Sequence, residues 1–299
     1  MAAQQSAEPS ALRWFARRVV RHVRWARTEG LRRLIAEDRL DPRVRIRTAW
    51  TKARWRQAHG VPPGAARAVY LVGLQRSGTN MLVRGLDEAP EVEARNENDR
   101  GLFHRFRLRG DDVLLDVLGR SRHLVVLVKP LCDSHRVADL LALSPGARAL
   151  WMWRDVDDRA RSEVAKFGDA NLRALRAIAA GDTSIWQAGG IDPARLDGFD
   201  LETMDPHTGA ALFWCLRNEL YFDLGLDQRD DVLLVSYGRM VADPAAVAEQ
   251  VCRFMGLPYR PSFAASVSAG PPRPRLPIDP RVRELCDALT ARLLVGARG

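Results

Sequence analysis

The stretch AVYLVGLQRSGTN, residues 68–80, decides the fold of this chain. It opens with a short apolar run and passes through a turn with two glycines into residues compatible with a helix. Gly73 and Gly78 have the spacing of a phosphate-binding loop between a β-strand and an α-helix. Backbone N–H groups in such a turn bind anions, and the positive end of the following helix adds to that binding. The stretch therefore predicts a phosphate-binding loop after a buried strand.

The same loop is poorly suited to the hydrolysis of a nucleoside triphosphate. A Walker A loop continues with Lys and then Ser or Thr, whereas this chain has Thr79 and Asn80. The lysine that reaches a γ-phosphate and the hydroxyl that binds Mg²⁺ are both missing from those positions. A P-loop kinase or NTPase is thus an alternative function that the loop disfavours.

Three further apolar runs share the character of the first, because each is short and is closed by polar residues. The runs cover residues 124–128, 149–153 and 232–235. The helix-compatible segments cover residues 80–88, 134–143, 157–180, 209–224 and 244–255. Short strands that are apolar on both faces and alternate with helices predict a buried parallel sheet. The fold class is therefore α/β, a P-loop-like parallel sheet with helices on both faces.

The residues that follow the four predicted strands are Arg76, Lys129, Arg154 and Tyr237. Ligands of parallel sheets bind beyond the carboxyl ends of the strands, so these side chains should converge. Three bases and one phenol predict an anionic ligand.

The loop from Gly73 to Asn80 resembles that of sulfotransferases dependent on 3′-phosphoadenosine-5′-phosphosulfate (PAPS). The resemblance implies the sulfotransferase fold and a loop that binds the 5′-phosphosulfate through Arg76, Ser77, Gly78, Thr79 and Asn80. The family usually has a second Thr or Ser at the position of Asn80, whose amide can still donate a hydrogen bond.

A second phosphate site is expected after the third strand. Arg154 and Ser162 are eight residues apart, which is similar to the family's motif for the 3′-phosphate that distinguishes PAPS from ATP. Arg offers a fork of donors and Ser a hydroxyl. Lys166, one helical turn beyond Ser162, would face the same way. The competing interpretation is that Arg154 pairs with a nearby acid.

Glu97 is the candidate general base. It follows the turn Pro90-Glu91-Val92, an arrangement similar to that in a branch of the family. That branch includes the protein-tyrosine sulfotransferases, many bacterial enzymes, and related carbohydrate and small-molecule sulfotransferases. A carboxylate beside the acceptor hydroxyl takes its proton during attack on sulfur. Two alternatives stay open: Glu97 belongs to an acidic surface stretch, or His104 is the base.

Charge on the breaking S–O bond is expected to be neutralised by Lys129 and Arg76. Lys129 resembles the Lys of the family's Lys-x-Pro segment, shortened here to Lys129-Pro130. A sulfuryl group carries less charge than a phosphoryl group, so fixed cations would suffice and no metal is expected. The resemblance implies PAPS as co-substrate.

Two features near the end of the chain match the family less closely. Tyr237 is a candidate cofactor contact, although the family's Tyr-Glu-Asp is Tyr-Gly-Arg here. The late PAPS-contacting loop of the family should lie between Ser262 and Arg275, with Arg273 or Arg275 as its candidates.

The net charge of +9 is concentrated at the start of the chain. Residues 1–60 hold fourteen Arg and one Lys against five acids, so the remainder is nearly neutral. We expect a basic helical N-terminal extension over residues 1–60, with helices near 10–27 and 41–58, and a sulfotransferase domain over 65–299.

Tryptophans interleave with the arginines of this extension, as in helices that lie on membrane surfaces. The extension either packs on its own domain or makes peripheral membrane contact, and a non-enzymatic membrane-surface protein is a second alternative function. No base-reading motif is visible, so no nucleic acid partner is expected.

The remaining features indicate a cytoplasmic protein, with the inner membrane surface as the alternative location. No apolar run is long enough to span a bilayer, and the start lacks the apolar stretch of a secretory signal. The four cysteines form no CxxC pair and are expected to be buried free thiols. The acceptor, through a hydroxyl or an amine, is a glycan, lipid, natural product or peptide. The sequence does not predict the oligomeric state.

Overall fold

The computed structural model describes residues 42–264, 267 and 273–297. The helix predicted near residues 10–27 and much of the predicted late loop lie outside the described residues. The chain divides into two compact units, residues 1–54 and 55–299. Helix α3 (Pro42–His59) agrees with the helix predicted over 41–58.

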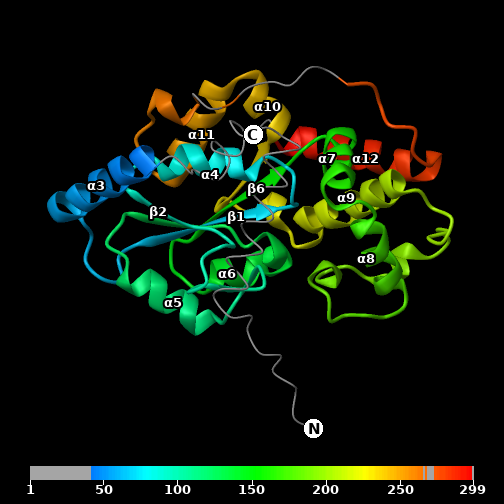
Figure 1. Ribbon diagram of the computed structural model, residues 1–299, viewed down its shortest axis with the longest axis horizontal. Helices are drawn as coiled ribbons and strands as arrows, with labels where there is room; N and C mark the ends of the chain where they lie inside the picture. The colour runs from blue at the N-terminus through cyan, green and yellow to red at the C-terminus, as the bar shows by residue number, and fades with distance from the viewer. Residues whose placement is uncertain (1–41, 265–266, 268–272, 298–299) are drawn as a thin grey trace, which may run out of the picture. The chain divides into compact units, whose positions relative to one another are not determined.

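Five parallel strands form the central sheet in the order β2-β5-β1-β6-β7 (Figure 1). Their bounds are β1 (Arg67–Gly73), β2 (Val92–Arg95), β5 (Val125–Val128), β6 (Arg148–Trp153) and β7 (Val232–Ser236). Tyr70 in the middle of β1 is in register with Val128 of β5 and with Ala149 of β6. Because the chain continues from this central strand to strands on both of its sides, the carboxyl end of β1 is where a ligand is expected to bind.

Helices cover both faces of the sheet, which confirms the predicted α/β class. One face is covered by α4 (Thr79–Asp87), α10 (Tyr237–Ala242) and α11 (Pro244–Met255) (Figure 1). The other is covered by α5 (Asp111–Arg120), α6 (Val137–Ala142), α9 (Pro206–Asp223) and α12 (Pro280–Gly296).

The two cores follow from the alternation of side chains along the strands. Val69 and Leu71 pack with α4 and α11, whereas Tyr70 and Val72 pack with the helices of the opposite face. All four are fully buried, as expected for strands covered on both sides.

Some elements differ from those predicted. The helix expected over 157–180 is two helices, α7 (Val156–Phe167) and α8 (Ala170–Ala179), because Gly168 between them has φ +61° and ends α7. The segment 134–143 is a 3₁₀ turn, η1 (Leu131–Arg136), followed by α6. The hairpin β3 (Phe103–His104) and β4 (Arg107–Leu108), the strand β2 and the helices α5 and α12 were not predicted. Four further 3₁₀ turns connect the larger elements: η2 (Trp186–Ala188), η3 (Pro193–Leu196), η4 (Leu226–Gln228) and η5 (Pro261–Phe263).

All four cysteines are buried and free, as predicted. None of the helices in the described ranges is long and apolar enough to cross a membrane.

Candidate active site

The loop after β1 requires glycine at two positions. Gly73 has φ +117° and Gly78 has φ +91°, both in the region that favours glycine. A Cβ on Gly73 would collide with the carbonyl oxygen of Met152, and one on Gly78 would collide with the ring of Tyr237. The backbone of the loop is therefore packed directly against β6 and the start of α10.

Ser134 holds the beginning of this loop in place. Its hydroxyl accepts a hydrogen bond from the Gly73 N–H at 3.0 Å and lies 2.9 Å from the Gly73 carbonyl oxygen. Within the loop, Ser77 is fully buried, and among the described residues its Oγ has no hydrogen-bond partner. Buried hydroxyls are seldom left unsatisfied, so a ligand group fits at this position.

Arg76 and Ser162 are brought together across 86 residues of sequence. The Arg76 Nε donates to Ser162 Oγ of α7 at 2.9 Å, and Arg76 has φ +70°, which is uncommon for a residue other than glycine. The predicted 5′-site and the predicted 3′-site are thus adjacent.

Arg154 and Tyr237 form a second contact at the same edge. The Arg154 guanidinium lies 4.3 Å from the centre of the Tyr237 ring, and in the described part of the chain its buried Nε has no hydrogen-bond partner. The competing interpretation from the sequence also has support, because an Arg154 Nη lies 3.2 Å from Asp158. Lys166 is half-buried one turn after Ser162, and its part in the site rests on helical spacing alone.

Lys129 connects the phosphate loop with Glu97. Its Nζ donates to Asn80 Oδ1 at 2.6 Å and lies 3.1 Å from Glu97 Oε2, and both side chains of the ion pair are largely buried. Burial raises the pKa of the Glu97 carboxyl above its usual range; the Lys129 ammonium opposes that rise without cancelling it.

The structure also describes the alternative base and the two late-loop candidates. His104 is exposed on the two-residue strand β3. Arg275 forms ion pairs with Asp157 and Asp287, and Arg273 is exposed.

Sequence reasoning missed a buried arginine that supports the loop. Arg159 is fully buried, donates to the carbonyl oxygen of Gln75 at 3.3 Å and to Asn171 Oδ1 at 2.6 Å, and pairs with Glu163 at 3.3 Å. The four-residue spacing of Arg159 and Glu163 on one helix was the available signal.

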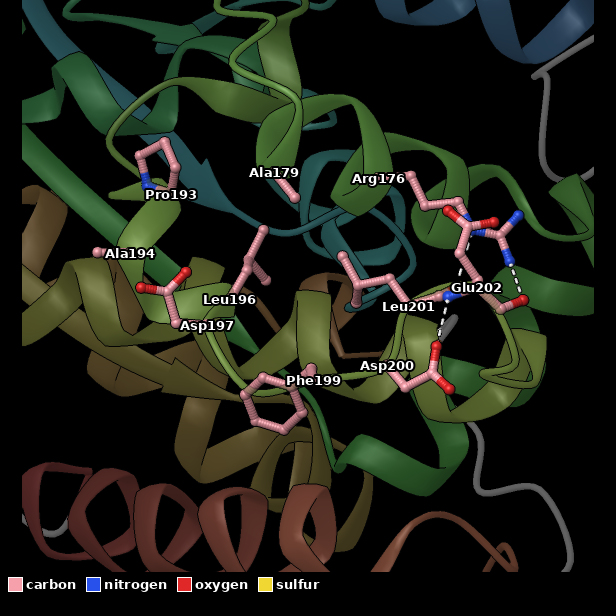
Figure 2. Close-up of a pocket in the computed structure, with 10 residues that line it drawn as sticks. All are labelled: Arg176, Ala179, Pro193, Ala194, Leu196, Asp197, Phe199, Asp200, Leu201 and Glu202. Atoms are coloured by element: carbon pink, nitrogen blue, oxygen red, sulfur yellow. Dashed lines mark hydrogen bonds and ion pairs between the residues drawn. The ribbon is translucent and has the colours of Figure 1, made fainter.

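A pocket between α8 and the segment that follows it does not coincide with this cluster (Figure 2). Figure 2 shows Asp197, Asp200 and Glu202 along its lining, while Arg176 donates to the carbonyl oxygens of Leu201 and Glu202. Three carboxylates disfavour an anionic ligand there, and none of the predicted site residues lines the pocket.

A family model described as the sulfotransferase domain matches residues 66–268 of the chain. The chain belongs to the sulfotransferase family. It is a PAPS-dependent transferase, and the transfer of a sulfuryl group is its general activity. No curated protein sequence matches this sulfotransferase.

Solved structures similar to this sulfotransferase carry the same description. One is a sulfotransferase from Alicyclobacillus acidocaldarius, with 17% identity, 79% of this chain and 94% of that chain covered, and a TM-score of 0.42. A second is the sulfotransferase domain from the curacin biosynthetic pathway, with 14% identity, 75% of this chain and 98% of that chain covered, and a TM-score of 0.49. A third is mouse SULT7A1 complexed with PAP, the desulfonated product, with 11% identity, coverage of 83% and 92%, and a TM-score of 0.45. Since these values are low, family membership rests on the match over residues 66–268.

The residues at the loop fit PAPS. The Ser77 Oγ and Arg154 Nε are buried donors suited to phosphate oxygens. The loop that would surround the phosphate keeps its shape only with glycine at positions 73 and 78, because a Cβ at either would collide with its neighbours. Within the part of the chain that the structure describes, no group of three or more His, Cys, Asp or Glu side chains could hold a metal ion.

Proposed function

We propose that this sulfotransferase moves the sulfuryl group of PAPS to a hydroxyl or an amine of its acceptor, with Glu97 as general base. The observation that carries the proposal is the contact of Lys129 with both Asn80 and Glu97. Asn80 is the second residue of the helix after the phosphate loop, so one ammonium joins the expected phosphosulfate site to the expected base. This juxtaposition supports Glu97 over His104, which is exposed on β3.

Each phosphate of PAPS is assigned to its own group of residues. Ser77, Gly78, Thr79 and Asn80, together with Arg76, bind the 5′-phosphosulfate. Arg154 and Ser162 bind the 3′-phosphate, with Lys166 and Tyr237 as further contacts. The unpartnered Arg154 Nε and the short distance from Arg76 to Ser162 support this assignment.

The reaction follows from these positions. Glu97 takes the proton of the acceptor hydroxyl as the oxygen attacks sulfur, and the bond between sulfur and the bridging oxygen breaks. Lys129 and Arg76 neutralise the charge that develops on the departing phosphate. Once Glu97 is protonated, its attraction for Lys129 falls, so the ammonium is free to pair with the leaving oxygen.

The test compares Glu97→Gln with His104→Ala. Glutamine keeps the size of the side chain but cannot accept the proton, so turnover should fall by roughly 10²–10⁴-fold. Affinity for PAP, measured by calorimetry, should change little, since Glu97 is not assigned to a phosphate. Near-native turnover in Glu97→Gln, with a loss in His104→Ala, would reverse the two roles.

The acceptor is not named by these residues; glycans, lipids, natural products and peptides all carry suitable groups. We also propose that residues 1–60 are an extension of a catalytic domain over 65–299. Helix α3 contains six Arg or Lys residues and no acid, and it exposes Ile46 and Trp50. These features support a peripheral contact with an anionic membrane surface.

A further inference from the structure

Arg217 of α9 is a buried cation to which the proposed mechanism gives no role. It is 2% exposed, and within the described ranges no carboxylate forms an ion pair with it. One guanidinium nitrogen donates to the carbonyl oxygen of Gly189, while the buried Nη2 has no hydrogen-bond partner among the residues that the structure describes. Burial lowers the pKa of Arg217 to about 10, and the charge of Asp133 opposes that fall without forming an ion pair with Arg217 among the described residues. The buried Nη2 therefore calls for a further hydrogen-bond partner.

An aromatic ring and a histidine lie close to Arg217 and to the glycine whose carbonyl it contacts. The ring of Trp186 lies 5.8 Å from the guanidinium carbon, and the backbone of Gly189 is packed against the His135 ring. The Nδ1 of His135 is also buried and unpartnered. Burial, reinforced by the charge of Arg217, lowers the pKa of His135 to about 4, so the imidazole is neutral at physiological pH.

This cluster adjoins the proposed reaction centre. Cys132 contacts the phosphate loop, since Gln75 of that loop donates to its Sγ at 3.6 Å. Burial raises the pKa of the Cys132 thiol to about 12, the Glu97 carboxylate adds to that rise, and Arg217 opposes it, so both charges lie near this thiol. The neighbouring acid, Asp133, is engaged by the backbone N–H of Leu108 at 2.7 Å and by Arg107 at 3.2 Å.

A second buried arginine shows what a structural role requires. Arg159 is fully buried as well, and among the described residues its Nη2 also makes no hydrogen bond. That Nη2 lies 3.3 Å from Glu163, however, and the other guanidinium nitrogens donate to Asn171 and to two backbone carbonyls. Arg217 has one backbone carbonyl as its hydrogen-bond partner in the described part of the chain. The two residues therefore have the same chemistry and burial but different degrees of internal satisfaction.

We propose that Arg217 binds a carboxylate of the acceptor, beside the hydroxyl or amine that Glu97 deprotonates. A carboxylate supplies the charge that Arg217 lacks and accepts hydrogen bonds from the guanidinium fork. The neutral His135 ring provides a further polar contact, and Trp186 offers an apolar wall. The substrate class is thus an anionic hydroxy or amino acceptor, an inference that rests on the proposed function.

The experiment measures thermal unfolding of the full chain saturated with PAP. Three carboxylates are added in turn: 4-hydroxyphenylacetate, D-glucuronate and 3-hydroxybutyrate. Each is matched with a neutral counterpart, namely 4-hydroxyphenylacetamide, D-glucose and 3-hydroxybutyramide. We expect at least one carboxylate to raise Tm while its neutral counterpart does not, and Arg217→Met to abolish that rise while Arg217→Lys keeps part of it.

Two further readouts separate a binding role from a structural one. Without any acceptor, Arg217→Met should be as stable as the wild type or more so, because it replaces a buried charge that has no ion-pair partner among the described residues by an apolar side chain. The matched variant Arg159→Met should be clearly less stable, because it leaves Glu163 and Asn171 without their partner. A large loss of stability in Arg217→Met would overturn the proposal in favour of a structural role.

The remaining outcomes distinguish this inference from the proposed function. If PAP does not stabilise the wild type, the proposed function fails. If PAP stabilises the wild type and no carboxylate acts through Arg217, the inference alone fails. A tenfold loss of PAP affinity in Arg217→Met would reassign the residue to the co-substrate and also overturn the inference.

Discussion

The pKa of Glu97, which depends on burial and on the ion pair with Lys129, should set the pH dependence of the reaction. Burial raises the pKa of Glu97, and Lys129 partly opposes that effect. A general base must be ionised, so activity should fall as the pH drops through this pKa, at a higher pH than for an exposed carboxyl. We expect Lys129→Met to move this acid limb of kcat/KM to still higher pH and also to reduce kcat.

The measurement is a pH–rate profile of the wild type, Lys129→Met and Glu97→Gln with one acceptor. The limb should disappear in Glu97→Gln. An acid limb that stays in place, or moves to lower pH, when Lys129 is removed would show that Glu97 is not the group that titrates.

Substitution of Gly78 by alanine should cost stability through both backbone strain and steric collision, and Gly181 serves as a control for the strain alone. Ala at this position meets both a φ of +91° and the Tyr237 ring, whereas Ala at Gly181 meets a φ of +83° with no atom within 4 Å. Strain costs about 1–3 kcal/mol, and overpacking adds about 1–3 kcal/mol. We expect Gly78→Ala to lose more stability than Gly181→Ala and also to weaken PAP binding. Equal losses, with PAP affinity intact in both, would contradict the packing of the loop against Tyr237.

The site residues that could be predicted are those that follow strands within recognisable motifs. Arg76, Lys129 and Arg154 belong to this group, and the structure brings Arg76 to Ser162 and Lys129 to Asn80 and Glu97. Ser134 could not be assigned, because its role depends on a contact with Gly73, which is 61 residues away in sequence.

Among the elements, α7 anchors the segment that leads into α12. Asp157, in the first turn of α7, accepts from the Leu276 N–H at 3.0 Å and from both Nη atoms of Arg283 at 2.7 and 3.1 Å. Burial acts to raise the pKa of Asp157, but these hydrogen bonds and the charges of Arg283 and Arg275 hold the pKa below its ordinary value of 3.8. The carboxylate therefore stabilises the folded chain above that pH, and this contribution is lost as the pH falls below it.

We expect Asp157→Asn to lower stability at neutral pH, because Arg283 loses its counter-charge. Removing one partner of a buried pair costs about 3–5 kcal/mol. Asp287→Asn is the matched control, since the pair of Asp287 with Arg275 is exposed and such pairs are worth about 0–1 kcal/mol. Chemical denaturation at neutral and at acidic pH provides the measurement. The difference between wild type and Asp157→Asn should shrink in acid, and a difference that is independent of pH would contradict the role of the charge.

Prediction of the elements succeeded where apolar runs are long enough to be buried on both faces. β1, β5, β6 and β7 were found in this way. Strand β2 escaped because it lies at the edge of the sheet and contains Glu93 and Arg95, so its pattern is mixed. Helix α12 buries Val282, Cys286, Leu289 and Leu293 at helical spacing, a signal that was present but was not interpreted.

On the scale of the whole molecule, the second compact unit begins at Trp55, and the domain boundary between residues 60 and 65 stays a prediction. Trp55 stacks on His123 with ring centres 6.0 Å apart and planes inclined by 4°. The charge pattern that suggested the boundary does not register this contact, because Trp55 and His123 are far apart in sequence.

We expect Trp55→Ala to lower Tm by more than Trp50→Ala. Aromatic stacking contributes about 0.5–1.5 kcal/mol beyond the area buried, which corresponds to a few degrees in a domain of this size. Trp50 is 63% exposed, so its removal should have little effect. Thermal unfolding of the two full-length variants is the test, and equal Tm values would show that Trp55 does not stabilise the second unit.

The central claim is that this protein recognises the two separate phosphates of PAPS. Calorimetric titration with PAP and with AMP, which differ only in the 3′-phosphate, tests this claim most directly. Charge-assisted hydrogen bonds contribute about 1.5–3 kcal/mol each, so PAP should bind more than about tenfold tighter. Arg154→Met should remove most of that preference. Equal affinity for PAP and AMP in the wild type would contradict the assignment of Arg154 and Ser162, and with it the account of this site.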